Sequence, residues 1–238
     1  MGFNELNSVE HYIIHQLSGL NLNTKELQEP TSSYGVQWVF KSSEELQRSV
    51  NEVLVESELK EALIRLNPDI AAKPELADQI VHVLLRNISD VNQVGLVKAN
   101  EEFFKWMTGE KTMPFGANNR HVPIKLIDFD ELSNNTYIVT NQYRIHHKET
   151  KIPDVVMMIN GIPVVVGEAK TPIRPSVSWL DGAHEVHDIY ENAVPQLFVP
   201  NILSFATEGK ELYYGAVRCP LEFWAPWRLE NDDDAIAK

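Results

Sequence analysis

The stretch that decides the fold is IPDVVMMINGIPVVVGEAKTP, residues 152–172. Two runs of β-branched and other apolar residues flank the pair Asn160-Gly161. An Asn-Gly pair between two such runs is the sequence pattern of a β-hairpin. We therefore predict two antiparallel strands that are joined at this pair.

Three charged residues occupy the outer ends of these strands: Asp154 on the first, and Glu168 and Lys170 on the second. Alternate residues of a strand point to the same face, so Glu168 and Lys170 share a face. Asp154 joins them only if it lies opposite Glu168. A plain two-residue turn would set it opposite Gly167 and turn Glu168 to the other face. We therefore predict a three-residue loop at 160–162, or a β-bulge that restores the same register.

An acid on one strand, with an acid and a base two residues apart on its neighbour, can form a metal-dependent nuclease centre. Two carboxylates and the Ala169 carbonyl are hard oxygen ligands that suit Mg²⁺, and the bound ion helps to generate hydroxide from water. We assign Asp154 and Glu168 as catalytic metal ligands. Lys170 is the third catalytic residue, which orients or deprotonates the water or offsets charge in the transition state. The alternative is a surface hairpin with charged ends, because a Glu-x-Lys string is common.

The pattern Pro153-Asp154…Glu168-Ala169-Lys170 resembles the PD-(D/E)xK nuclease motif. With the turn Asn160-Gly161-Ile162-Pro163 between its halves, it is similar to the N-terminal endonuclease domain of the restriction (R) subunit of type I restriction–modification enzymes. Weaker matches extend over most of the chain, at residues 10–17, 127–129, 141–143, 195–201 and 207–209.

This resemblance implies Mg²⁺-dependent cleavage of double-stranded DNA and assembly with modification (M) and specificity (S) subunits. It also implies a motor domain later in the same polypeptide, which would use ATP. This chain should bind no ATP itself, since Thr-Gly-Glu-Lys-Thr at 108–112 lacks the phosphate-loop spacing. Two alternatives stay open: a docking module without catalysis that couples the motor to partner subunits, and a stand-alone PD-(D/E)xK nuclease of another family.

Two auxiliary residues follow from the same resemblance. Many members carry Gln-x-x-x-Tyr on the helix after the Lys. Tyr190 fits the Tyr position, but Val186 stands where the Gln is expected, so Glu185 or His187 substitutes or the element is missing. Glu10 is the candidate acid of the first helix. The alternative interpretations are a packing tyrosine and a solvated acid near a helix start.

The chain carries a formal net charge of −13, which argues against a free-standing DNA-binding protein because phosphate neutralisation needs Lys and Arg. DNA must then be held locally or by other domains. Lys148, Lys151 and Arg174 near the hairpin are the candidate DNA contacts, and the alternative is a solvated strand edge. We expect weak DNA binding by the chain alone, most visible at low salt.

The pattern of elements predicts an α/β protein whose mixed central β-sheet is flanked by helices, as in the restriction-endonuclease core, with a helical N-terminal extension. We expect a nuclease domain over 1–228, helical at about 1–118 with its sheet core at about 119–218, and a linker at 229–238. Predicted helices cover 8–20, 42–54, 57–66, 74–87, 100–108 and 179–190. Besides the hairpin, predicted strands cover 37–40, 53–55 (as an alternative to helix), 122–127, 137–143, 202–206 and 212–217.

The expected location is the cytoplasm. The chain has no apolar run near the ~20 residues that a membrane helix needs, and its start lacks the basic and apolar regions of a signal peptide. The single cysteine, Cys219, excludes an internal disulfide framework and suits a reducing compartment.

Overall fold

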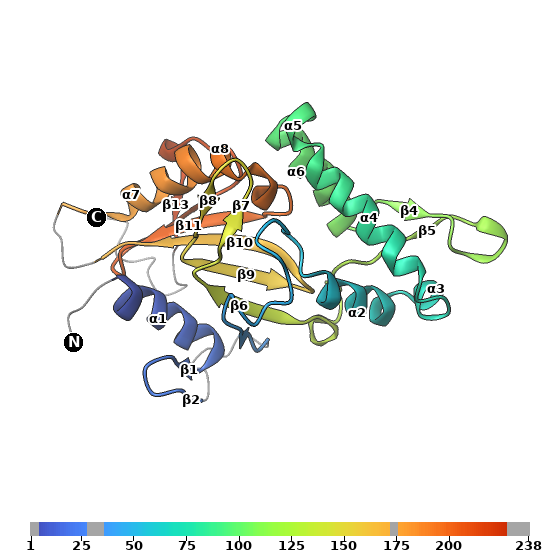
Figure 1. The fold of residues 1–238 in the computed structure, drawn as a ribbon, viewed down its shortest axis with the longest axis horizontal. Helices are drawn as coiled ribbons and strands as arrows, with labels where there is room; N and C mark the ends of the chain where they lie inside the picture. The colour runs from blue at the N-terminus through green and yellow to red at the C-terminus, as the bar shows by residue number, and fades with distance from the viewer. Residues whose placement is uncertain (1–4, 28–35, 172–175, 228–238) are drawn as a thin grey trace, which may run out of the picture.

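A seven-stranded mixed β-sheet forms the centre of the protein in the computed structural model, which describes residues 5–27, 36–171 and 176–227 (Figure 1). The strand order is β13-β12-β11-β10-β9-β6-β3. The predicted α/β class, with helices around a mixed sheet, is confirmed. The predicted linker at 229–238 lies outside the described residues.

Two strand pairs of the sheet are parallel, β10 with β11 and β3 with β6, and the other neighbours are antiparallel. A parallel pair needs a long crossover, and the helical segment after β10 provides it for β11. The strands of the sheet are β3 (Val39–Phe40), β6 (Tyr137–Asn141), β9 (Val155–Ile159), β10 (Ile162–Ala169), β11 (Leu203–Thr207), β12 (Leu212–Gly215) and β13 (Ala225–Pro226). The described residues also form three short two-stranded ribbons: β1–β2 (Leu20–Asn21, Glu26–Leu27), β4–β5 (Thr112–Met113, Val122–Pro123) and β7–β8 (Ile145–His146, Thr150–Lys151).

Helices cover the sheet on both faces, and a helical arm (α2 to α6) extends to one side (Figure 1). The helices are α1 (Glu5–Ser18), α2 (Glu56–Leu66), α3 (Pro68–Ala71), α4 (Leu76–Ser89), α5 (Val91–Val94), α6 (Leu96–Met107), α7 (Trp179–His184), the π-helix η3 (Glu185–Tyr190) and α8 (Glu191–Ala193). Short 3₁₀ turns are η1 (Ala117–Asn119), η2 (Leu132–Asn134), η4 (Pro195–Phe198) and η5 (Leu221–Phe223). Within the described residues, no helix has the length and apolar character to cross a membrane.

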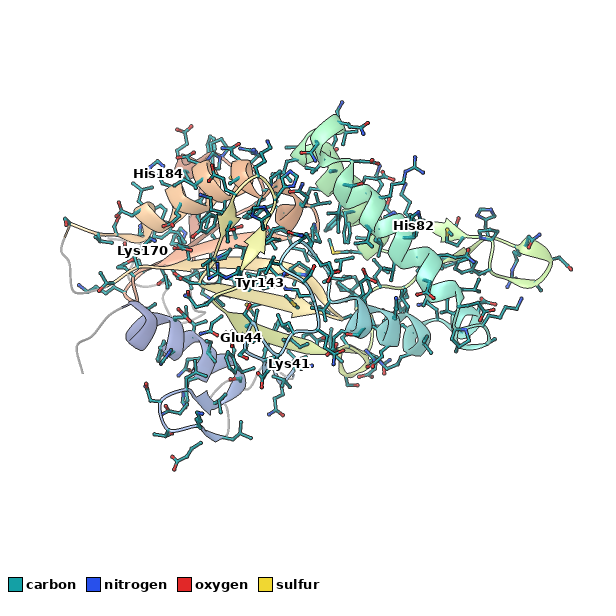
Figure 2. All side chains as sticks on the ribbon, viewed as in Figure 1. Lys41, Glu44, His82, Tyr143, Lys170 and His184 are labelled. Atoms are coloured by element: carbon teal, nitrogen blue, oxygen red, sulfur yellow. The ribbon has the colours of Figure 1, made fainter. Side chains whose placement is uncertain are left out.

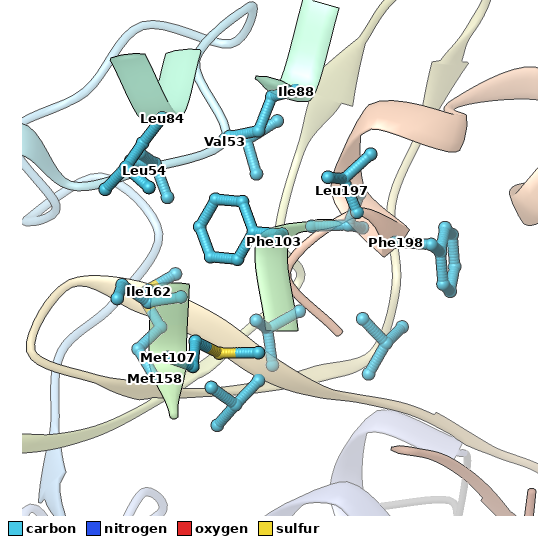
Figure 3. Close-up of a cluster of buried hydrophobic side chains, with 14 of the residues drawn as sticks. Val53, Leu54, Leu84, Ile88, Phe103, Met107, Met158, Ile162, Leu197 and Phe198 are labelled. Carbon is cyan, nitrogen blue, oxygen red and sulfur yellow. The ribbon is translucent and has the colours of Figure 1, made fainter. Parts of the chain in front are cut away.

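Alternating residues of the strands fill two separate apolar clusters. Val139 and Val155 pack with Ile14 of α1 on one face. Their neighbours Ile138 and Val156 face the other way, into the larger cluster that joins the sheet to α7, η3 and the helical arm. Figure 3 shows part of this cluster, where side chains of α6 meet the hairpin. The period of two in these strands therefore fixes which end-of-strand residues share a face.

The hairpin of residues 152–172 forms as predicted over β9 and β10, and the bulge, not the three-residue loop, sets its register. Asn160 and Gly161 make a two-residue turn with φ of 52° and 76°, because Ile159 pairs with Ile162. The register then shifts between Pro163 and Val165, which leaves one extra residue on β10. After this bulge Gly167 lies opposite Val155, and the next step sets Glu168 opposite Asp154.

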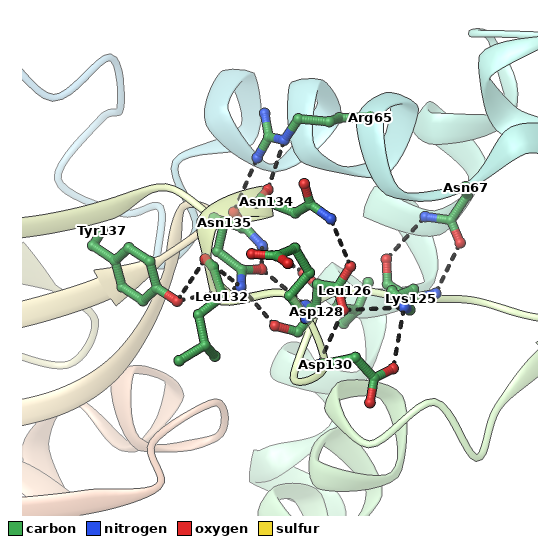
Figure 4. A network of polar contacts seen from close by, with 12 residues as sticks. Arg65, Asn67, Lys125, Leu126, Asp128, Asp130, Leu132, Asn134, Asn135 and Tyr137 are labelled. Carbon is green, nitrogen blue, oxygen red and sulfur yellow. Dashed lines mark hydrogen bonds and ion pairs between the residues drawn. The ribbon is translucent and has the colours of Figure 1, made fainter. Parts of the chain in front are cut away.

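A buried network of hydrogen bonds stabilises the Asn160-Gly161 turn. Asn160 is fully buried, and its amide donates to the Leu126 carbonyl and to Asn135 Oδ1, both at 2.8 Å, while its Oδ1 accepts from the Thr136 N–H. Asn135 and Asn134 extend the network to Asp128 and to Arg65 of α2 (Figure 4). Hydrogen-bonded polar groups of this kind fix one geometry, because each would be costly to bury unpaired.

Two predicted elements are wrong. Residues 42–54 form turns, not a helix or a strand, because Ser42 and Ser49 each bind the glutamate three residues later through their own backbone N–H, and such local bonds compete with a helix. The strand predicted at 122–127 stops at Pro123, because the Asn67 side chain forms hydrogen bonds with both the backbone N–H and the backbone carbonyl of Lys125, which a neighbouring strand would otherwise use. The strand Val39–Phe40, within the predicted 37–40, joins the sheet beside β6.

Candidate active site

Asp154 and Glu168 lie side by side where β9 begins and β10 ends. The backbone N–H of Ala169 donates to Asp154 Oδ2 at 2.9 Å, which fixes that carboxylate beside β10. Helix α7 packs against the same face, since a Cβ built at Gly182 would lie 3.4 Å from Glu168 Cγ. The structure therefore brings the two predicted acids together on one face of the sheet.

Lys170 completes this group. Its Nζ lies 2.8 Å from Glu168 Oε1 and forms a second, shorter ion pair with Glu185 Oε2. In Figure 2 Lys170 lies at one end of the sheet, away from the helical arm that carries His82. Burial lowers the pKa of Lys170, but the two carboxylates outweigh it and hold the pKa above its ordinary value. The side chain is therefore an ammonium ion at neutral pH.

Glu168 is the most deeply buried acid of the three-residue motif, with 3% of its surface exposed. Burial first, and the negative charge of Asp154 second, raise its pKa to about 9. Its Oε2 is buried and has no hydrogen-bond partner among the described residues. Burial also raises the pKa of Asp154, although the Ala169 N–H favours the charged form. In both acids the effect of burial therefore outweighs the positive charge of Lys170, which lowers their pKa values.

Glu185 takes the place that the sequence leaves open. It accepts hydrogen bonds from Lys170 and, at 3.0 Å, from the Tyr190 hydroxyl. Tyr190 lies five positions after Glu185, one more than the four positions of Gln-x-x-x-Tyr. The segment Glu185–Tyr190 is a π-helix, in which hydrogen bonds join residues five apart, so both side chains face the site. Val186 is fully buried in the core.

Glu10 reaches the same end of the sheet from α1. It is 1% exposed, and its carboxylate accepts from Asn141 Nδ2 at 2.5 Å and from Gln142 Nε2 at 3.0 Å. Gln142 Nε2 also donates to Asp154 Oδ1 at 3.0 Å. Burial raises the pKa of Glu10 to about 7, against the two amides, which lower it. The predicted auxiliary acid is thus joined to the motif through one amide group.

The predicted DNA contacts differ in their surroundings. Lys148 is exposed in the turn of the β7–β8 ribbon, which leads from Gln142 back to Asp154. Lys151 lies in the same ribbon but is paired with Glu149 at 2.8 Å. The third predicted contact, Arg174, lies outside the described residues.

Sequence reasoning gave Asn141 and Gln142 no role in the site, although they end a strand beside the acidic motif. A polar pair at that position was the available signal. Glu185 was one of three open options, because no pattern in the sequence shows where a π-turn begins. Arg144, exposed just before β7, is a further cation near the motif in sequence that the sequence analysis did not single out.

Comparison with known proteins places this geometry in a family. The model of the type I restriction enzyme R protein N terminus matches residues 2–223. The chain is 27% identical over 191 residues to the type I restriction enzyme HindI endonuclease subunit of Haemophilus influenzae, covering 78% of this chain and 17% of that protein. It is 23% identical over 238 residues to the putative type I restriction enzyme MjaIXP endonuclease subunit of Methanocaldococcus jannaschii, covering 97% and 21%.

A second relative from Methanocaldococcus jannaschii, the putative type I restriction enzyme MjaVIIP endonuclease subunit, is 36% identical over 93 residues, which are 38% of this chain and 8% of that protein. The chain thus spans about a fifth of the length of the two relatives that it matches over most of its own length. Since the family model covers nearly all of the sequence, the chain belongs to the family of the type I restriction enzyme R protein N terminus.

Proposed function

We propose that this chain is a Mg²⁺-dependent endonuclease centre that cleaves double-stranded DNA as part of a type I restriction R subunit. Asp154 and Glu168 are the metal ligands, and Lys170 acts on the attacking water. The observation that carries the proposal is the meeting of these three side chains on one face, at the adjoining ends of β9 and β10. A charged surface hairpin would have no reason to bury Glu168 to 3% exposure.

The residues present fit a magnesium ion. Glu168 Oε2 is buried and lacks a donor among the described residues, so a cation would satisfy it, and Asp154 supplies a second carboxylate on the same face. In the described part of the chain, no three His, Cys, Asp or Glu side chains are grouped to hold a metal. Water and the Ala169 carbonyl would complete the shell, which suits Mg²⁺ because it usually keeps several waters.

When bound, the ion would supply positive charge to the scissile phosphate and lower the pKa of a water molecule. Lys170 is charged, so its ammonium group orients the water and offsets the negative charge that develops on the phosphate. Glu185 and Glu168 hold the ammonium group from two sides. The water oxygen bonds to phosphorus as the bond to the leaving sugar oxygen breaks, with no covalent enzyme intermediate; the attacking water gives up a proton to solvent and the leaving oxygen takes one up.

DNA and the partner subunits belong to the proposal for the whole protein. With a net charge of −13, the chain should hold DNA only locally, through exposed cations such as Lys148 and Arg144 in the segment that leads from Gln142 back to Asp154. The motor domain of the same polypeptide, which uses ATP, and the M and S subunits would bring the duplex to this centre. The relatives are named endonuclease subunits of type I restriction enzymes, which supports this assembly.

The docking-module alternative rested on the acidic composition and on the missing Gln. The contacts of Glu185 with Lys170 and Tyr190 supply a substitute for that Gln, so the missing Gln no longer favours a docking module. The nuclease proposal is therefore the better supported of the two.

The deciding experiment uses the complete complex that contains this chain, with plasmid DNA, Mg²⁺ and ATP. Asp154→Ala and Lys170→Ala should each abolish cleavage, while ATP hydrolysis continues at the wild-type rate because the motor lies elsewhere. Lys73→Ala, at an exposed position of the helical arm, is the control and should cut normally. Cleavage by both site variants would show that the catalytic assignment is wrong.

A further inference from the structure

Gln142 stands between two acids that come from opposite faces of the sheet. Its side-chain nitrogen lies 3.0 Å from Glu10 Oε2 and 3.0 Å from Asp154 Oδ1. Glu10 belongs to α1, whose Ile14 packs on the face that carries Val155. Asp154, one residue before Val155, shares the opposite face with Glu168. A primary amide has two N–H groups, one for each carboxylate.

The backbone of Gln142 is held in an uncommon conformation at this point. Its φ is 49°, in the left-handed region that costs a non-glycine residue free energy. Its N–H donates to the Asp154 carbonyl at 3.0 Å, and the next N–H, of Tyr143, donates to the Pro153 carbonyl at 2.9 Å. The buried Tyr143 is anchored in turn, since its hydroxyl donates to the Val53 carbonyl. These bonds turn the Gln142 side chain to the sheet end where both acids lie.

We propose that Gln142 is a positioning residue of the nuclease centre, which holds the Glu10 and Asp154 carboxylates in one convergent arrangement toward the metal. The inference rests on the proposed function. Two carboxylates repel each other, so without a shared donor each would turn toward water and away from the other. The second amide on Glu10, from Asn141 at 2.5 Å, does not reach Asp154 in the structure, so it cannot replace this link.

Three substitutions separate the link from the backbone conformation. Gln142→Met keeps the length and removes the donor. Gln142→Asn keeps the amide and tolerates a positive φ, but is one methylene shorter and cannot span both acids. Gln142→Gly removes the side chain and relieves the left-handed strain. Gln93→Met, at an exposed position of α5, is the matched control.

The test uses the full-length polypeptide that contains this chain. Supporting partners of metal ligands are typically worth about 10- to 100-fold in affinity or activity. We therefore expect all three variants to bind Mn²⁺ about tenfold or more weakly in a nucleotide-free titration followed by electron paramagnetic resonance, with Asp154→Ala as the blank. In the complete complex they should need correspondingly more Mg²⁺ for half-maximal cleavage. Gln142→Gly should keep the wild-type unfolding temperature.

The outcomes distinguish this inference from the proposed function. If Asp154→Ala abolishes cleavage but Gln142→Met keeps the wild-type Mn²⁺ affinity and Mg²⁺ requirement, the inference on Gln142 fails alone. Full rescue by Gln142→Asn would also overturn it, since reach would then be irrelevant. A loss of Mn²⁺ affinity that follows a loss of folded protein in every variant would assign Gln142 a structural role. Cleavage by Asp154→Ala would overturn the proposed function itself.

Discussion

Replacing Glu168 by Gln should stabilise the metal-free protein while it abolishes DNA cleavage. The wild-type side chain is 3% exposed, and burial together with Asp154 raises its pKa from 4.5 to about 9. Between these values the folded chain keeps a proton on Glu168 that the unfolded chain has lost. The free energy of unfolding therefore falls as pH rises. Gln has nearly the same shape and no proton to lose, so the variant escapes this cost.

The size of the effect follows from the raised pKa. One pH unit within the window corresponds to about 1.4 kcal/mol. The difference in free energy of unfolding between the Glu168→Gln variant and the wild type should therefore grow by about 3 kcal/mol from about pH 6 to about pH 8. Lys170 stays charged over this range, and the neutral Glu168 and its Gln replacement both offer it an oxygen acceptor, so its contribution to the difference is nearly constant. The slope, and not the absolute difference, carries the prediction.

Urea unfolding in the presence of EDTA measures this slope at several pH values for both proteins. The two stability curves should diverge steadily as pH rises, and added Mg²⁺ should stabilise the wild type more than the variant, because only the wild type keeps both carboxylates. Parallel curves would refute the claim that Glu168 is buried at a free-energy cost. A variant whose free energy of unfolding falls relative to that of the wild type as pH rises would refute it too. Other groups that titrate in this range cancel in the comparison.

Other substitutions test the turn, the support of the lysine and the DNA contacts. Gly161→Ala should lower the free energy of unfolding, measured by thermal unfolding, by about 2–4 kcal/mol, since φ is 76° and the new Cβ would meet a backbone oxygen at 2.5 Å. Gly109→Ala is the control, because Gly109 has a φ of 74° but lies in open space, and it should lower this free energy by only about 1 kcal/mol. Equal losses for the two variants would contradict the packing argument. Asn160→Ala should lower the free energy of urea unfolding by about 2–4 kcal/mol because it leaves buried backbone groups unpaired, and a loss under about 0.5 kcal/mol would contradict the network's importance. Glu185→Ala should slow plasmid cleavage about tenfold or more, whereas Glu185→Gln, which keeps an acceptor for the lysine, should stay closer to the wild type; indistinguishable rates for all three proteins would deny it a role. Lys148→Gln should reduce the salt dependence of DNA binding, measured by fluorescence anisotropy, by about one counterion, and an unchanged slope would remove it from the interface.

Local chemistry made the hairpin predictable. The Asn160-Gly161 turn and the flanking apolar runs follow from short-range preferences. The register followed from a requirement of function, because Asp154 and Glu168 had to share a face. That requirement left two backbone solutions, and the structure uses the bulge near Val164. The extra residue there lies in an unbroken apolar run, where nothing in the sequence marks a bulge.

The rest depended on contacts that no local pattern encodes. The π-helix that turns Glu185 toward Lys170 inserts one residue into an otherwise helical segment, and the sequence alone could not choose between Glu185 and His187. Gln142 donates hydrogen bonds to Glu10, which lies 132 residues away in the sequence, and to Asp154, which lies 12 residues away. Residues 42–54 have a helical apolar spacing, but serine–glutamate bonds divide them into separate turns.

The direct test of Asp154 and Glu168 as the ligands of the catalytic ion is anomalous diffraction from crystals of the protein grown with Mn²⁺. We expect one Mn²⁺ peak at this end of the sheet, about 2.1 Å from an oxygen of each carboxylate, and we expect Glu168→Gln crystals to lose it. A Mn²⁺ ion bound away from these two side chains, or an occupied site that survives the substitution unchanged, would contradict the assignment.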